Sequence, residues 1–124
     1  MERKRKILIV DDEEDFCDFV KMNLEATTDF EVSVCYDSGE AIGKVRGQRP
    51  DLILLDIMMP GISGAEIAEE LKDSDDTHDI PIIFLTALVR EEEAKRKGVI
   101  GGRRFIAKPV QTIELISIID GILQ

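Results

Sequence analysis

Short apolar segments alternate with longer amphipathic segments along the chain. Uninterrupted apolar runs occur at residues 7–10, 32–35, 52–55 and 82–85, and a weaker run occurs at 105–106. Strands that are apolar at every position are typical of a parallel sheet covered by helices on both faces. The alternation therefore predicts a doubly wound α/β fold with right-handed crossovers.

The segments between the apolar runs have helical patterns. Residues 16–24 place apolar side chains four positions apart, on one face of a first helix. Asp37 and Glu40 have the spacing of a capping box and predict the start of a second helix. Residues 64–72 predict a third helix, and residues 90–97 predict a short fourth helix.

The last predicted helix, residues 111–124, has an unusually wide apolar side. Its apolar residues cover about 160° of the helix surface, more than packing on one sheet face usually requires. They are Leu115, Ile116, Ile118, Ile119, Ile122 and Leu123. Two interpretations stay open: deep packing of a terminal helix, or contact of part of this stripe with a partner.

The composition indicates one globular domain spanning residues 1–124. The 124 residues include 44% hydrophobic and 34% charged residues, enough to build a buried core. Subtracting 26 Asp and Glu from 16 Lys and Arg gives a formal net charge of −10. This charge argues against direct binding to nucleic acid or anionic lipid, because phosphate polyanions are bound through Lys and Arg.

Cysteine usage and the N-terminus favour a soluble, cytoplasmic protein. Cys17 and Cys35 are too few for a disulfide framework and are expected to be small core residues. The basic N-terminus is followed by only four apolar residues, at 7–10, which fits a strand rather than a signal peptide. No segment approaches the ~18 apolar residues that a membrane span needs.

Polar residues follow the apolar runs directly. They are Asp11, Asp12, Asp56, Thr86 and Lys108. The carboxyl ends of parallel strands meet at one edge of an open sheet, where ligands bind. The five side chains are therefore expected to converge.

The convergence predicts phosphoryl chemistry. Carboxylates ~4 Å apart repel by about 4 kcal/mol per pair at an effective dielectric of ~20, which favours a bound Mg²⁺. Lys108 supplies a point charge for a phosphate, and Thr86 supplies a hydroxyl donor. Asp56, exposed by the turn-forming sequence after its strand, is the candidate nucleophile for forming an acyl phosphate.

Four segments together resemble the receiver domain of two-component response regulators. They are Ile7-Leu8-Ile9-Val10-Asp11-Asp12-Glu13, residues 51–61 with Asp56 and Met58-Met59-Pro60-Gly61, Pro81-Ile82-Ile83-Phe84-Leu85-Thr86-Ala87, and Phe105-Ile106-Ala107-Lys108-Pro109. The resemblance covers essentially the whole chain. It implies a single flavodoxin-like (βα)5 domain with a five-stranded parallel sheet in the order 2-1-3-4-5, and a cis Lys108–Pro109 peptide bond.

The resemblance also implies a role for each site residue. Asp56 would accept a phosphoryl group from a sensor histidine kinase or a histidine phosphotransfer protein. Mg²⁺ would be held by Asp11, Asp12, Asp56 and the Met58 backbone carbonyl. Thr86 and Lys108 would contact the phosphoryl group, and Thr86 and Phe105 would form the switch.

Such a domain is not an enzyme toward other substrates, because it catalyses only its own phosphorylation and dephosphorylation. Phosphorylation would switch the face around helix 4, strand 5 and helix 5. The signal would pass to an effector protein, to a fused output domain or to a second copy in a phosphorylation-dependent homodimer.

Some positions depart from the family pattern or tune it. Gly101-Gly102-Arg103-Arg104 and Ser63 stand where the family more often has other residues. Met58 and Leu88 occupy positions that in this family tune hydrolysis of the phosphoryl group. Both are apolar and cannot orient a water molecule, so we expect slow self-dephosphorylation.

The segment from residue 90 to residue 108 is locally basic, with seven basic residues against three acidic ones: Arg90, Lys95, Arg96, Lys97, Arg103, Arg104 and Lys108 against Glu91, Glu92 and Glu93. A solvated face and a surface for an acidic partner or a dimer both remain open.

Alternative functions fit less well. Binding of FMN requires a loop that cradles phosphate after the first strand, but residues 11–15 are acidic. A phosphatase of the haloacid-dehalogenase type has an Asp-x-Asp pattern, which would require a second Asp two residues after Asp56. Position 58 is Met. Residues 39–44 fall short of a Walker A motif. The main rival is a phosphorylation-independent, receiver-like interaction module.

Overall fold

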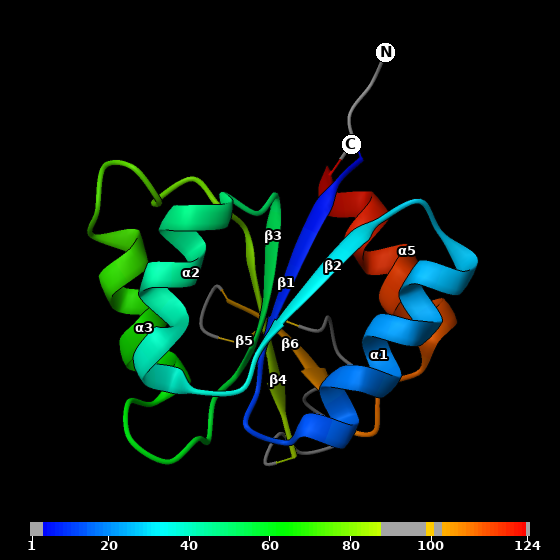
Figure 1. The fold of residues 1–124 in the computed structure, drawn as a ribbon, viewed down its shortest axis with the longest axis horizontal. Coiled ribbons are helices and arrows are strands. Elements are labelled where there is room, and N and C mark those ends of the chain that lie inside the picture. Colours follow the sequence, from blue (N-terminus) through cyan, green and yellow to red (C-terminus); the bar gives the residue numbers. More distant parts are fainter. Residues whose placement is uncertain (1–3, 88–98, 101–102, 124) are drawn as a thin grey trace.

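The computed structural model describes residues 4–87, 99–100 and 103–123. Eleven elements follow one another along these residues (Figure 1): β1 (Lys6–Val10), α1 (Glu14–Thr27), β2 (Glu31–Cys35), η1 (Ser38–Glu40), α2 (Ala41–Gln48), β3 (Leu52–Asp56), α3 (Gly64–Lys72), β4 (Ile82–Thr86), β5 (Val99–Ile100), β6 (Arg103–Ala107) and α5 (Thr112–Leu123). The predicted fourth helix, 90–97, lies outside the described residues.

The sheet has the strand order β2-β1-β3-β4-β6-β5. Its first five strands are parallel, and they confirm the predicted order 2-1-3-4-5, with β6 as the fifth predicted strand. The two-residue strand β5 was not predicted; it adds an antiparallel edge through the pairs Val99–Arg104 and Ile100–Arg103. Every parallel strand runs in the same direction, so all their carboxyl ends reach the lower edge of the sheet in Figure 1.

Helices cover both faces of the sheet, and each face has its own apolar core. Alternate residues of the buried strands point to opposite faces, so Ile7 and Ile9 join one core while Leu8 and Val10 join the other. Helices α1 and α5 cover the first core, and α2 and α3 cover the second (Figure 1). Strand β3 is buried along its whole length, which explains its uninterrupted apolar sequence.

The helix boundaries confirm one prediction and correct another. Helix α3 spans the predicted residues, and its start is fixed by a capping box between Ser63 and Glu66. The capping box expected from Asp37 and Glu40 does not form. The Asp37 side chain instead accepts a hydrogen bond from the Gly39 backbone in the short η1 turn, and α2 begins one turn later.

The wide apolar stripe of α5 is largely used for packing. Leu115 and Ile119 are buried, and the four other residues of the stripe are partly buried against the same core as α1. Ile113, outside the stripe, is 85% exposed. The interpretation of deep packing therefore accounts for the stripe.

Both cysteines are buried in the core, as predicted. Cys17 belongs to the core under α1, and Cys35 belongs to the core on the opposite face of the sheet. Burial, and after it the nearby Asp11 carboxylate, raise the pKa of the Cys17 thiol to about 12. Burial also raises the pKa of the Cys35 thiol, so neither thiol has the character of a reactive cysteine.

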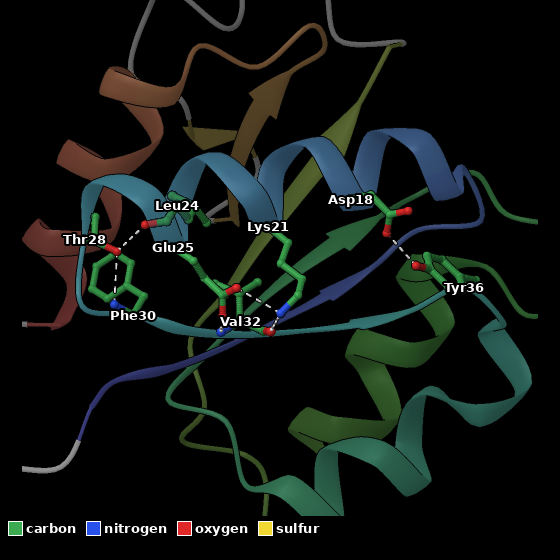
Figure 2. Close-up of polar contacts among 8 residues, drawn as sticks. All are labelled: Asp18, Lys21, Leu24, Glu25, Thr28, Phe30, Val32 and Tyr36. Atoms are coloured by element: carbon green, nitrogen blue, oxygen red, sulfur yellow. Dashed lines mark hydrogen bonds and ion pairs between the residues drawn. The ribbon is translucent and has the colours of Figure 1, made fainter.

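Side chains of α1 protect the edge strand β2 (Figure 2). Lys21 Nζ donates a hydrogen bond to the Val32 carbonyl over 2.8 Å, and Glu25 Oε2 accepts one from the Val32 backbone N–H over 3.1 Å. The two side chains also pair with each other at 3.0 Å. Further along, the Tyr36 hydroxyl donates to Asp18 Oδ1 over 2.6 Å. The two contacts with Val32 occupy backbone groups that an edge strand would otherwise offer to another chain.

Among the described residues, no helix is both long enough and apolar enough to cross a membrane.

Candidate functional site

Three carboxylates meet at the carboxyl edge of the sheet. Asp11 follows β1, Asp12 comes next, and Asp56 is the last residue of β3. One oxygen from each lies within 4.8 Å of the others. Asp11 and Asp56 are buried, whereas Asp12 is exposed. The sheet thus brings the predicted acidic residues together at its edge.

Lys108 lies beside these carboxylates, after β6. Its Nζ is 2.7 Å from Asp11 Oδ2, 2.7 Å from Glu13 Oε1 and 3.7 Å from Asp56 Oδ2. Burial lowers the pKa of Lys108, but hydrogen bonding and attraction from the Asp11, Glu13 and Asp56 carboxylates outweigh it, and the net shift is upward. The ammonium group is therefore charged at neutral pH.

The acidic site retains unfavourable electrostatics despite Lys108. Burial raises the pKa of Asp56 to about 6, and repulsion from Asp11 acts in the same direction. The buried Asp11 Oδ2 meets the Lys108 ammonium group in an ion pair at 2.7 Å, whereas Asp56 Oδ2 lies 3.7 Å from the same group. One ammonium group therefore faces several carboxylates, and the raised pKa of Asp56 shows that it does not offset their burial and mutual repulsion.

The donor set fits a hard divalent cation. The three possible ligand atoms are carboxylate oxygens, two of the three carboxylates are buried, and the carboxylates repel one another. Mg²⁺ prefers oxygen ligands and is usually held by one or two carboxylates together with water and phosphate.

The loop after Asp56 is held by its own backbone. The Met58 N–H donates to Asp56 Oδ1 over 3.3 Å, and the Gly64 N–H donates to the Ile57 carbonyl over 2.9 Å. Gly61 has a φ of 85°, which favours glycine. A Cβ atom at Gly64 would lie 2.1 Å from the Asp56 carbonyl oxygen, so glycine is required there as well.

Ser38 fastens the same loop through its side chain. Its buried hydroxyl donates to the Pro60 carbonyl over 2.9 Å and accepts from the Ile62 N–H over 3.1 Å. The segment between Asp56 and α3 is therefore tied at both its ends and at its middle, which keeps the Asp56 carboxylate in place.

Thr86 and Phe105 occupy the neighbouring strands. Thr86 is buried at the end of β4, and its carbonyl accepts a hydrogen bond from the Lys108 N–H over 3.0 Å. Phe105 on β6 is half-buried and stacks on Phe84 with 5.4 Å between the ring centroids. The Lys108–Pro109 peptide bond is cis, as the resemblance implied.

The structure describes only part of the predicted basic segment and one of the two positions expected to tune hydrolysis. The sequence groups Lys108 with the basic residues of the segment 90–108. Its side chain is only 13% exposed and pairs with the acidic site, so the prediction of a basic surface is wrong for this residue. Arg104 is exposed, and the rest of the basic segment and Leu88 lie outside the residues whose side chains are described. The Met58 side chain is 62% exposed.

Glu13, Phe16 and Gly64 contribute to the site but were not predicted. Glu13 and Phe16 contact Lys108 from the start of α1, and Gly64 touches the Asp56 backbone. Gly64 carried a signal, because glycine is an unfavourable helix residue and its place at the first position of α3 invites a packing explanation. Glu13 and Phe16 carried none, because their partner is about 95 residues away in the chain.

Comparison with known proteins agrees with this fold and site. A family model described as the response regulator receiver domain matches residues 7–120. The chain belongs to this family, whose members act in two-component signalling.

Individual relatives come from several bacteria. The phosphate regulon transcriptional regulatory protein PhoB of Rhizobium meliloti is 37% identical over 119 residues, a match that covers 96% of this chain and 52% of PhoB. The chain thus spans about half the length of this curated relative.

Solved structures give the same result. A response regulator from Desulfuromonas acetoxidans is 29% identical, with a TM-score of 0.81 and 96% of each chain covered. The chemotaxis response regulator CheY4 of Vibrio cholerae is 26% identical, with a TM-score of 0.81, and the match covers 98% of this chain and 100% of CheY4.

Proposed function

We propose that Asp56 accepts a phosphoryl group in a Mg²⁺-dependent reaction and that this modification is the input signal of the domain. The observation that carries the proposal is the position of Asp56: a nearly buried carboxylate within 4.8 Å of two others and 3.7 Å from a lysine ammonium group. A carboxylate that served only to stabilise the fold would gain little stability beside two other carboxylates. A carboxylate that must meet a cation and a phosphoryl group needs them.

Asp11, Asp12, Asp56 and the Met58 backbone carbonyl would hold the metal ion. When bound, Mg²⁺ would neutralise charge on the carboxylates and on the phosphoryl oxygens. An Asp56 oxygen attacks phosphorus, and the bond from phosphorus to the donor breaks, with the electron pair leaving on the donor atom. Lys108 and the Thr86 hydroxyl then stabilise the phosphoryl oxygens from β6 and β4.

The physiological donor is proposed to be a sensor histidine kinase or a histidine phosphotransfer protein, because the chain belongs to the receiver family. The match to half of PhoB, a transcriptional regulatory protein, supports an output through a fused domain or a separate effector. Phosphorylation would draw the β4 and β6 loops together through Thr86 and Lys108, and Phe105 would transmit the change. Pairing of two phosphorylated copies stays a prediction, to be checked by measuring the mass in solution.

The experiment is incubation with Mg²⁺ and acetyl phosphate, followed by measurement of the intact mass. We expect wild type to gain one phosphoryl group and Asp56→Asn to gain none. Asp51→Asn is the matched control, because Asp51 precedes the other end of the same strand and the amide oxygen can still accept the hydrogen bond from the Lys6 N–H. A folded wild-type protein that gains no mass would favour the phosphorylation-independent interaction module.

The phosphoryl group is expected to be lost slowly once it has formed. The exposed Met58 side chain has no group that could orient a water molecule for attack. We expect a half-life of minutes or longer, and we expect Met58→Asn to shorten it. A wild-type half-life of seconds, measured by the decay of the phosphorylated mass after removal of the donor, would contradict this prediction.

A further inference from the structure

Lys108 is held mainly by residues other than the proposed phosphoryl acceptor. Its Nζ makes 2.7 Å contacts with Asp11 and Glu13 but remains 3.7 Å from Asp56. It also lies 4.5 Å from the centroid of the Phe16 ring, a distance at which the ring face attracts a cation. Glu13 and Phe16 both belong to the start of α1, so this helix start restrains the lysine.

The position of Glu13 departs from the usual residue preference at the start of a helix. It occupies the N-cap position of α1, where Ser, Thr, Asp or Asn is preferred, and its side chain makes no capping hydrogen bond. Its carboxylate accepts a hydrogen bond from Lys108 instead. The Glu13 N–H donates to Asp11 Oδ1 over 3.0 Å, which fixes the residue beside the acidic site. Positions that violate local preferences are often functional.

We propose that Glu13 and Phe16 form a latch that holds Lys108 in a resting position, and that phosphorylation requires Lys108 to exchange Glu13 for the phosphoryl group. This inference rests on the proposed function of Asp56. Glu13 is outside the trio of carboxylates that can share a cation, so metal binding leaves its charge free to hold Lys108. The phosphoryl group offers about two negative charges and three acceptors, and a 64% exposed carboxylate is the weaker competitor.

Opening of the latch would carry a signal of its own. The contact between Glu13 and Lys108 joins the start of α1 to the loop after β6, 95 residues further along the chain. Once Lys108 moves to the phosphoryl group, these two segments lose that connection. The start of α1 would then report phosphorylation in addition to the face reached through Thr86 and Phe105.

The test compares phosphorylation rates at saturating Mg²⁺, after the Mg²⁺ affinity of each variant has been measured. We expect Glu13→Gln to be phosphorylated by acetyl phosphate about two- to fivefold faster than wild type, because the weakened latch frees Lys108. Glu14→Gln is the matched control, since it removes the same charge one residue away. Damage to the structure would slow the reaction, so an increase in rate identifies the latch.

A second variant tests the aromatic part of the latch. Phe16→Leu keeps an apolar side chain but removes the ring face, and we expect a smaller increase, about twofold at most. Equal rates for Glu13→Gln and Glu14→Gln would overturn the latch while leaving the proposed function in place. A wild-type protein that accepts no phosphoryl group would overturn both, whereas a faster Glu13→Gln beside an unchanged Glu14→Gln supports both.

Discussion

The start and the middle of helix α1 meet two polar networks of opposite character. In the middle, Lys21 and Glu25 satisfy both backbone groups of Val32 and pair with each other. At the start, the carboxylates beside Lys108 repel one another, and burial together with this repulsion raises the pKa of Asp56. The first network is complete in the isolated protein. On the proposed function, the second would become favourable when a cation and a phosphoryl group join it.

This difference means that structural and functional polar residues can be distinguished by the change in stability when they are neutralised. A structural network should lose stability when one of its members is neutralised. A site preorganised for a missing ligand should gain stability, because the protein alone bears the repulsion. Three substitutions sharpen or break this comparison.

The largest effect is expected at the backbone support of the site. Gly64→Ala would place a Cβ atom 2.1 Å from the Asp56 carbonyl oxygen, so the backbone must shift. We expect a loss of about 3 kcal/mol in the free energy of unfolding, measured by urea denaturation. Gly43→Ala is the matched control, because a Cβ there meets nothing within 4 Å and alanine favours the helix by about 0.5–1 kcal/mol. Equal effects of the two variants would show that the approach at Gly64 is unimportant.

Neutralising Asp56 is expected to stabilise the metal-free protein. Burial, together with repulsion from Asp11, raises the pKa of Asp56 from 3.8 to about 6. The unfolded chain therefore ionises first, and wild-type stability falls as the pH rises between these values and stays reduced above pH 6. Asp56→Asn avoids this loss, so we expect a gain of about 1–3 kcal/mol at pH 8 with a chelator present.

The gain of Asp56→Asn should shrink as the pH is lowered through 6 toward 4, and thermal unfolding at several pH values measures this trend. Added Mg²⁺ should stabilise wild type more than the variant, since the variant has lost a ligand. A variant that is less stable than wild type at pH 8 would place Asp56 among the structural residues and break the comparison.

The smallest effect is expected at the edge of β2. The Val32 N–H and then Lys21 lower the pKa of Glu25, so the carboxylate stabilises the fold above its ordinary pKa of 4.5 and this contribution is lost as the pH falls below that value. We expect Glu25→Gln to cost about 0.5–1 kcal/mol at pH 7 in urea denaturation. Glu69→Gln, on the exposed side of α3, is the control. A stabilising Glu25→Gln would contradict the structural role of the network.

Much of the fold was predictable because burial on both faces of the sheet marks its strands so strongly. The run of residues 52–55 has no polar position, and the strand that contains it is buried along its whole length. The convergence of Asp11, Asp56 and Lys108 followed from one rule, that parallel strands end at the same edge. Strand β5 was missed because two residues carry too little pattern to predict a strand.

The contacts within the site were less predictable than its location. Sequence pattern assigned Lys108 to the phosphoryl group but could not show that it lies closer to Glu13 than to Asp56, since that choice depends on ångström differences between distant segments. Asp37 illustrates local competition: its side chain reached the nearer Gly39 N–H in a tight turn, and the expected box did not form. The equivalent spacing of Ser63 and Glu66 did form one.

The close approach of Gly64 to Asp56 has a mechanical consequence. No side chain separates Gly64, the first residue of α3, from the Asp56 carbonyl, so the two backbone segments are in close contact. The hydrogen bond from the Gly64 N–H to the Ile57 carbonyl holds them together. We therefore expect a displacement of the start of α3 to move the Asp56 backbone as well. A molecule that grips α3 from outside could in this way strain or relax the carboxylate without ever entering the site.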